Sequence, residues 1–242
     1  MQSVGHPNRP AQLLLLAAAL LGGGWLAPST LSSQRVTLRT DDGVLLAATW
    51  YEPVVRPAPA VVLVHMLQRS RRDWESLASH LAAGGIGALT FDLRGHGESQ
   101  GSALEHLAMV QDVKAARRYL GTRSDVLPGQ IGFMGASLGA SIAALAAAED
   151  TSVRTLALLS PALDYRGLRI EAAVRKVGAR PMLLVASDDD PYALRSARDL
   201  QKGNVRSREL LILNGAGHGT NMLARSPDLG AALLDWFRRT LL

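Results

Sequence analysis

The sequence contains no cysteine among its 242 residues. The absence of cysteine excludes disulfide bonds, thiolate metal ligands, a cysteine nucleophile and a lipid-modified N-terminal cysteine. It does not decide the compartment, because proteins without disulfides occur on both sides of a membrane.

Aromatic residues are also scarce, at 5% of the chain, although the net charge is +5. Proteins that bind nucleic acid usually combine a basic stripe with interleaved aromatic residues. The tightest basic cluster in the body of the chain is only Arg69, Arg71 and Arg72. We therefore expect no nucleic-acid partner, and we predict that the arginines lie on a solvated surface.

The sequence offers no clear site for a metal or a cofactor. No histidine and carboxylate spacing indicates metal ligands, and no glycine-rich phosphate loop opens a helix at a suitable position. We therefore expect neither a metal ion nor a cofactor. The oligomeric state leaves no signature in the sequence.

The first residues differ in character from the rest. Arg9 precedes the apolar run Leu13 to Leu21, and small residues follow it, including Ala27-Pro28-Ser29. This order is typical of an export signal. The apolar run is shorter than the about 20 residues that a membrane-spanning helix needs. We predict that residues 1–33 are a signal peptide or an N-terminal membrane anchor of an exported (periplasmic or secreted) protein. The alternative is a leucine-rich helix of a cytosolic protein. Membrane association is expected through this segment only.

The remaining residues, 34–242, are predicted to form one domain, since nothing between them resembles a linker. Residues 35–40 and 44–51 alternate in polarity around the turn Asp41-Asp42-Gly43, which predicts an antiparallel hairpin.

Strands and helices are predicted to alternate after the hairpin. Near-continuous apolar runs, typical of parallel strands covered on both faces, occupy residues 60–65, 86–91, 130–134, 155–159, 181–186 and 209–213. Stretches with helical spacing lie at 72–83, 104–120, 138–148, 192–200 and 227–241. This alternation predicts a doubly wound α/β fold with a mostly parallel sheet. Residues 160–180 leave room for one helix, at 167–177, and a turn, so we expect an open site.

The run Gly135-Ala136-Ser137-Leu138-Gly139 stands between a predicted strand and an alanine-rich predicted helix. A serine on so tight a turn has its hydroxyl held clear of the sheet, and the flanking glycines let strand and helix approach closely. Gly-x-Ser-x-Gly also occurs in ordinary glycine-flanked turns. The strand before it and the helix after it favour a nucleophile at Ser137.

A serine nucleophile needs a base, and the base needs an orienting carboxylate. His218 lies in the glycine-rich loop Gly215–Gly219, after the last predicted strand. Asp188, Asp189 and Asp190 follow the preceding predicted strand, and at most one of them can be buried against the imidazole. Asp190 stands before Pro191, so the aspartates could instead form a helix N-cap. Asp164, which follows the predicted strand at residues 155–159, is a further candidate for the orienting carboxylate.

Acyl transfer also needs backbone N–H donors for the oxyanion. We expect one from Leu138, at the start of the helix that follows the nucleophile. The second is expected from the loop after residues 61–64, where Leu67 is preferred and Met66 comes second.

The chain resembles α/β-hydrolases from about Arg35 onward. The resemblance rests on the turn Phe91–Ser99, His65, the segment Gly135–Gly139 and Gly217-His218-Gly219. In that family the acid commonly lies three residues after a small residue that closes its strand. The spacing from Ser187 therefore implies Asp190 as the acid.

The chain also departs from the family pattern. Met66 replaces the usual glycine of the oxyanion loop. The short segment 160–180 is similar to compact bacterial esterases and the dienelactone hydrolase-like group, of which the latter generally uses a cysteine nucleophile. We expect Asp92 and His96 to stabilise their turn, and His65 to pack beneath the oxyanion loop.

These observations predict a serine hydrolase that cleaves a small-molecule carboxylic ester through an acyl-serine intermediate. Ser137 attacks, His218 moves the proton, Asp190 orients His218, and the N–H groups of Leu138 and Leu67 hold the oxyanion. The short cap indicates a small or exposed ester, with a short acyl chain. The alternatives are an exopeptidase or amidase with the same three residues, or a non-catalytic protein of the same fold that binds a ligand.

Overall fold

The computed structural model describes Met1, residues 32–204 and residues 206–242. The predicted signal peptide or anchor at residues 1–33 therefore lies almost wholly outside the described residues and stays a prediction. Within the described ranges, no helix has the length and apolarity that crossing a membrane requires.

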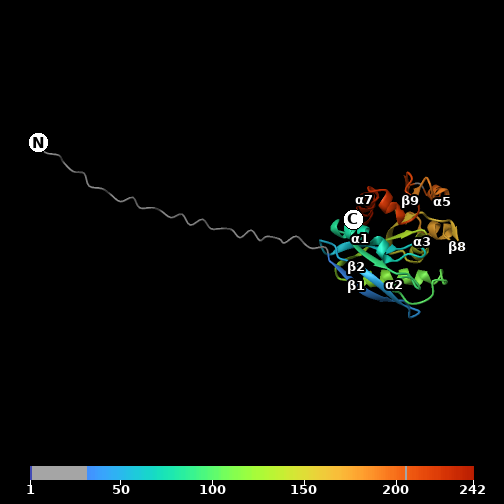
Figure 1. The fold of residues 1–242 in the computed structure, drawn as a ribbon, viewed down its shortest axis with the longest axis horizontal. Helices are drawn as coiled ribbons and strands as arrows, with labels where there is room; N and C mark the ends of the chain where they lie inside the picture. The colour runs from blue at the N-terminus through green and yellow to red at the C-terminus, as the bar shows by residue number, and fades with distance from the viewer. Residues whose placement is uncertain (2–31, 205) are drawn as a thin grey trace.

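The fold is built on an eight-stranded sheet in the order β1-β2-β4-β3-β5-β6-β9-β10 (Figure 1). The first two strands form the predicted antiparallel hairpin, β2 pairs antiparallel with β4, and all other pairs are parallel. The strand bounds are β1 Ser33–Arg39, β2 Leu45–Tyr51, β3 Ala58–Val64, β4 Gly87–Phe91, β5 Val126–Ala136, β6 Val153–Leu159, β9 Met182–Ser187 and β10 Arg208–Leu213. The predicted fold class is confirmed.

Helices cover both faces of the sheet and form two apolar cores. Alternate residues of β3 point to opposite faces, so that Val62 and Val64 lie in one core and Val61 and Leu63 in the other. The first core is completed by α2 (Met109–Gly121), α3 (Leu138–Glu149), α4 (Glu171–Val177) and α5 (Pro191–Lys202). The second is completed by α1 (Glu75–Ala83) and α7 (Leu229–Leu241). Burial on both faces explains why the strands read as unbroken apolar runs.

Two segments differ from the sequence prediction. Helix α2 begins at Met109 and not at residue 104, because residues 101–108 form turns in which Leu104 and Leu107 are 87% and 69% exposed. Between β6 and β9, the small hairpin of β7 (Asp164–Tyr165) and β8 (Leu168–Arg169) precedes α4, so the expected helix begins at Glu171.

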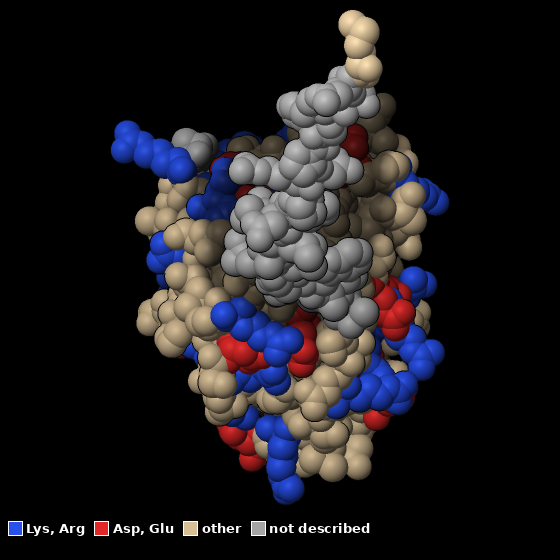
Figure 2. Space-filling view, turned by 90° about the vertical axis from the view of Figure 1, so that its left-hand side faces the viewer, with Lys and Arg blue, Asp and Glu red and all other residues tan. Residues whose placement is uncertain are grey.

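The arginines depart in part from the predicted solvated surface. On the face shown in Figure 2, Lys and Arg side chains are interspersed with Asp and Glu side chains. Arg71, Arg94 and Arg208, however, are buried. Arg208 donates hydrogen bonds to the carbonyl groups of Leu200 and Val174, at 2.5 and 2.9 Å. A buried guanidinium has five donors to satisfy, so these arginines join segments that are distant in the sequence.

The carboxyl ends of the parallel strands meet at one edge of the sheet. In the strand registers, Val64 of β3 pairs with Gly135 of β5, and Leu213 of β10 pairs with Ser187 of β9. The loops that follow these strands carry all the predicted functional residues, as the topology of open α/β sheets requires.

Candidate active site

Ser137 occupies a strained turn between β5 and α3. Its backbone angles are φ 53° and ψ −116°, a region that residues with a side chain rarely adopt. Its N–H donates to the carbonyl of Leu159 at 2.9 Å, which joins the turn to the end of β6. A Cβ at Gly135 would overlap the backbone of Gly139, and a Cβ at Gly139 would overlap the carbonyls of Val64 and His65. Both glycines are therefore required for the close approach of strand and helix, as predicted.

Ser137, His218 and Asp190 form a hydrogen-bonded row. The Nε2 atom of His218 lies 2.7 Å from the Oγ atom of Ser137, and its Nδ1 atom lies 2.5 Å from Oδ2 of Asp190. An ionised carboxylate only accepts, so Nδ1 carries the proton and Nε2 presents its lone pair to the serine hydroxyl. The arrangement can withdraw the hydroxyl proton of Ser137. The His218 side chain is 47% exposed, so the site is open to solvent.

Asp190 combines two roles that the sequence left as alternatives. Its Oδ1 atom accepts the N–H of Ala193 at 3.3 Å and caps α5, while Oδ2 contacts His218. The further candidate Asp164 lies in β7, where it accepts from the Gly167 N–H and from Arg169. Its side chain is not brought to the imidazole.

Asp188 and Asp189 contact the backbone of the histidine loop and not its imidazole. Asp188 accepts the N–H of Gly215 at 2.8 Å, and Asp189 accepts the N–H of Gly217 at 2.9 Å. A hydrogen bond from Ser187, followed by that from Gly217, holds the pKa of Asp189 below its ordinary value. The sequence predicted these two residues to be either competitors of Asp190 or part of a helix N-cap. No local pattern reveals contacts that depend on a loop 27 or 28 residues further along the chain.

The two segments predicted to donate N–H groups to an oxyanion lie close to Ser137. Leu138 is the first residue of α3, so its N–H has no acceptor within the helix and lies at the positive end of the helix dipole. Leu67 lies in a turn that is closed by the Arg69 N–H donating to the Met66 carbonyl at 3.2 Å. Because Val64 is in register with Gly135, this loop begins beside the serine turn.

His65 packs beneath that loop, as predicted. Its Nε2 atom accepts the N–H of Leu93 at 2.9 Å, so Nδ1 carries the proton and donates to the Met66 carbonyl at 2.8 Å. Burial of the ring lowers the pKa of His65 to about 4, and the side chain is neutral at neutral pH.

Met66, which replaces the usual glycine, packs against the histidine loop. Its Sδ atom lies so close to Gly219 that a Cβ there would come within 2.5 Å of the sulfur. The φ of Gly219 is also positive, at 61°. A larger residue at position 219 would therefore need a strained backbone and a shift of the methionine side chain.

The turn after β4 is held by two buried ion pairs. Asp92 accepts the backbone N–H groups of Arg71 at 2.7 Å and Glu98 at 2.9 Å, and pairs with the Arg71 guanidinium. The ring of His96 donates to the carbonyl of Arg94 at 3.0 Å. Both Asp92 and His96 thus stabilise their turn, as predicted.

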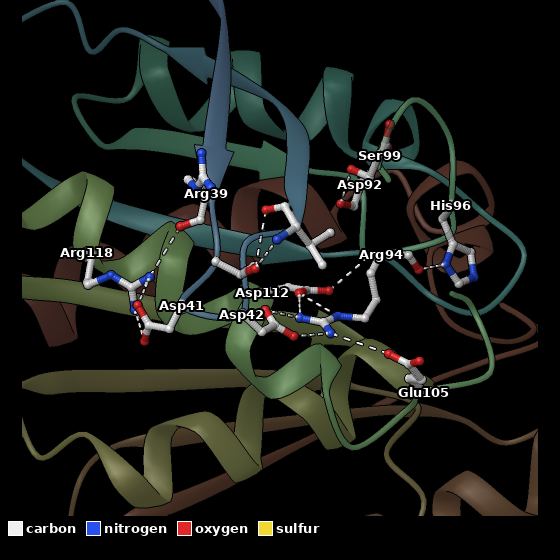
Figure 3. A network of polar contacts seen from close by, with 12 residues as sticks. Arg39, Asp41, Asp42, Asp92, Arg94, His96, Ser99, Glu105, Asp112 and Arg118 are labelled. Carbon is white, nitrogen blue, oxygen red and sulfur yellow. Dashed lines mark hydrogen bonds and ion pairs between the residues drawn. The ribbon is translucent and has the colours of Figure 1, made fainter. Parts of the chain in front are cut away.

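Arg94 is the centre of the second pair (Figure 3). Its Nε and Nη2 atoms donate to Asp112 at 2.9 and 2.7 Å, and Nη1 donates to Asp42 at 2.7 Å. Burial disfavours the charge of Arg94, but the bonds to Asp42 and Asp112 outweigh it and raise the Arg94 pKa. The bond from Arg94, together with one involving Thr40, lowers the pKa of Asp42 to about 2.

The described residues contain no group of three or more His, Cys, Asp or Glu side chains that could hold a metal ion. The reactive side chains that the structure brings together here are those of Ser137, His218 and Asp190.

The sheet order, the strained serine turn and the hydrogen-bonded row are features of an α/β-hydrolase. The family model described as serine aminopeptidase, S33, matches residues 55–182. An uncharacterized protein of Mycobacterium tuberculosis is 30% identical over 239 residues, which cover 89% of this chain and 82% of the relative. The chain belongs to the S33 family of α/β-hydrolases.

Solved structures of hydrolases share the fold. An esterase of Pyrococcus furiosus superposes with a TM-score of 0.75 and 18% identity, covering 88% of this chain and 94% of that one. A dienelactone hydrolase of Anabaena variabilis superposes with a TM-score of 0.71 and 20% identity, covering 88% of this chain and 99% of that one. These likenesses show that the chain shares the fold of these enzymes.

Proposed function

We propose that this protein hydrolyses carboxylic esters through an acyl-serine intermediate. The observation that carries the proposal is the row of hydrogen bonds from Ser137 through His218 to Asp190. The strained backbone of Ser137 supports it, because it presents the hydroxyl at the edge of the sheet where the loops converge.

In the first half of the reaction, Ser137 Oγ attacks the carbonyl carbon of the ester while His218 Nε2 takes the hydroxyl proton. The carbonyl oxygen becomes an oxyanion and accepts the N–H groups of Leu138 and Leu67. Asp190 stabilises the imidazolium. The C–O bond to the alcohol then breaks, and His218 returns the proton to the departing alkoxide.

In the second half, water replaces the alcohol. His218 takes a proton from water, the hydroxide adds to the acyl group on Ser137, and the second oxyanion uses the same N–H groups. Collapse releases the carboxylic acid and returns the proton to Ser137. The chain's own groups balance both steps, so no cofactor is required.

The proposed substrate is a small ester with a short acyl chain. Only a small hairpin and the seven-residue helix α4 stand between β6 and β9, in the place where a larger cap would lie. The exposure of His218 also supports an open site. A marked preference for laurate over butyrate esters of p-nitrophenol would contradict this substrate.

The test compares wild-type protein with Ser137→Ala in ester hydrolysis and in labelling by a fluorophosphonate probe. We expect the variant to lose labelling and to lose about 10⁴-fold or more of kcat/KM. Ser141→Ala is a matched control, since that hydroxyl lies in α3, the helix that follows Ser137, and is buried without a hydrogen-bond partner in the structure. Full activity in Ser137→Ala would refute the proposal.

The S33 family description gives a specific reason to test a second reaction. Its model is described as serine aminopeptidase, and the same three residues could cleave an amide. Aminoacyl anilides assayed beside aryl esters distinguish the two. Faster turnover of the anilides would assign an exopeptidase.

A further inference from the structure

Side-chain oxygens accept four of the five backbone N–H groups of the histidine loop, residues 215–219. Asp188 accepts from Gly215 at 2.8 Å, and Ser187 Oγ accepts from Ala216 at 2.8 Å. Asp189 accepts from Gly217 at 2.9 Å, and Ser160 Oγ accepts from Gly219 at 2.9 Å. The exception is His218 itself.

The acceptors come from the ends of two neighbouring strands. Ser187 closes β9, and Asp188 and Asp189 follow it, while Ser160 follows β6. Ser187 Oγ also donates to Asp189 at 2.5 Å. The hydroxyl of Ser187 therefore accepts from Ala216 and also orients the carboxylate that holds Gly217, the next residue of the histidine loop.

The loop needs such support because its own residues restrain it weakly. Gly215, Gly217 and Gly219 all have positive φ, at 59°, 79° and 61°. Glycine loses more conformational freedom on folding than any other residue, and these backbone angles are ones that few other residues adopt. Apart from the four acceptors, the loop is held by the burial of Ala216 and by the N–H groups of Asn221 and Met222, which donate to the carbonyls of His218 and Gly219, both at 3.3 Å.

We propose that Asp189, supported by Ser187, is a positioning residue that holds the His218 loop in register with Ser137, and that Asp188 is a weaker second anchor. The three consecutive aspartates thus divide their tasks. Asp190 orients the imidazole, and its two neighbours hold the backbone that carries the imidazole. The catalytic consequence of this inference rests on the proposed function. The backbone contacts themselves do not depend on that function.

The experiment compares Asp189→Ala, Asp189→Asn and Asp188→Ala, with Asp199→Ala as control. Asp199 is an exposed aspartate of α5 paired with Lys202, away from the histidine loop. We expect Asp189→Ala to lower kcat on an aryl ester about 10- to 100-fold with little change in KM, because small displacements of a catalytic group cost about that much. Asp188→Ala is expected to have a smaller effect, since Gly215 lies further from His218 than Gly217.

Asp189→Asn should restore most of kcat, because its amide oxygen can still accept from Gly217. The fluorophosphonate labelling rate should fall and recover in parallel. Wild-type kcat in Asp189→Ala, or no recovery in Asp189→Asn, would overturn the inference.

Amide hydrogen exchange of residues 215–219 gives a readout that does not depend on activity. Exchange at Gly217 should be faster in Asp189→Ala and near the wild-type rate in Asp189→Asn. Unchanged exchange in Asp189→Ala would overturn the positioning role. If the wild-type protein neither turned over esters nor reacted with the probe, the proposed function would fail, while exchange would still decide whether Asp189 holds the loop.

Discussion

Replacing His65 by glutamine should remove a large part of the acid sensitivity of the fold. The imidazole is fully buried, and its neutral form is fixed by the N–H of Leu93 and the carbonyl of Met66. Its pKa is lowered to about 4 from an ordinary value of 6.5. Between these values the unfolded chain binds a proton that the folded chain does not.

The free energy of unfolding should therefore increase as the pH rises from 4 to 6.5. The same contribution to stability should disappear as the pH falls from 6.5 to 4. One pKa unit corresponds to about 1.4 kcal/mol, so this single residue contributes a difference of about 3 kcal/mol between the ends of the window. Glutamine can still accept the Leu93 N–H, but it does not titrate.

Urea unfolding at several pH values across this window measures the effect. The wild-type protein should lose about 3 kcal/mol more stability toward acid pH than His65→Gln. Met66→Leu is the control, because it alters the same loop without changing a titratable group, and it should retain the wild-type pH dependence. Parallel curves for the wild-type protein and His65→Gln would refute the reasoning.

Two further predictions concern packing and charge. Asp112→Ala should lower the free energy of unfolding by about 3–5 kcal/mol, because it leaves the buried Arg94 guanidinium without its main acceptor. Asp42 binds the same guanidinium but is itself half exposed, so Asp42→Ala should lower the free energy of unfolding by about 1 kcal/mol or less. Equal decreases for the two variants in urea unfolding would contradict this account. Gly139→Ala should cost about 1–3 kcal/mol and lower kcat, because its Cβ would overlap the carbonyls that lead into the oxyanion loop. Gly230→Ala in α7 is its control, because the added Cβ meets only the His80 side chain of α1, at an ordinary contact distance of 3.8 Å. The stability of this variant should be kept or raised, and equal behaviour of the two variants would count against the packing argument.

Much of the fold could be predicted because its elements obey local rules. The apolar runs of β3 and β4 are continuous, since both faces of the sheet are covered, and the hairpin turn Asp41-Asp42-Gly43 has a glycine at φ 88°. The exception is instructive. Leu104 and Leu107 have helical spacing but remain exposed, so apolar periodicity alone misplaced the start of α2.

The sequence by itself determined the turn around Ser137 and the order in which serine, aspartate and histidine follow in the chain. These features depend on neighbouring residues: glycines two positions either side of Ser137, a strand before it and a helix after it. The strand ends then had to meet at one edge of the sheet, because parallel strands do so in any open α/β fold.

Only the tertiary structure decided how the three aspartates divide. Asp188, Asp189 and Asp190 are chemically identical and adjacent. The resemblance to α/β-hydrolases implied Asp190 through its spacing from Ser187, but nothing in the sequence assigned a task to the other two. Their partners lie in the loop at residues 215–219, and the backbone direction at each aspartate determines whether its carboxylate meets a glycine N–H or the imidazole. The burial of Arg94 between Asp42 and Asp112 has the same origin, because the residues that satisfy its charge are 52 and 18 positions away. Such contacts arise from how the chain returns on itself, which local sequence does not encode.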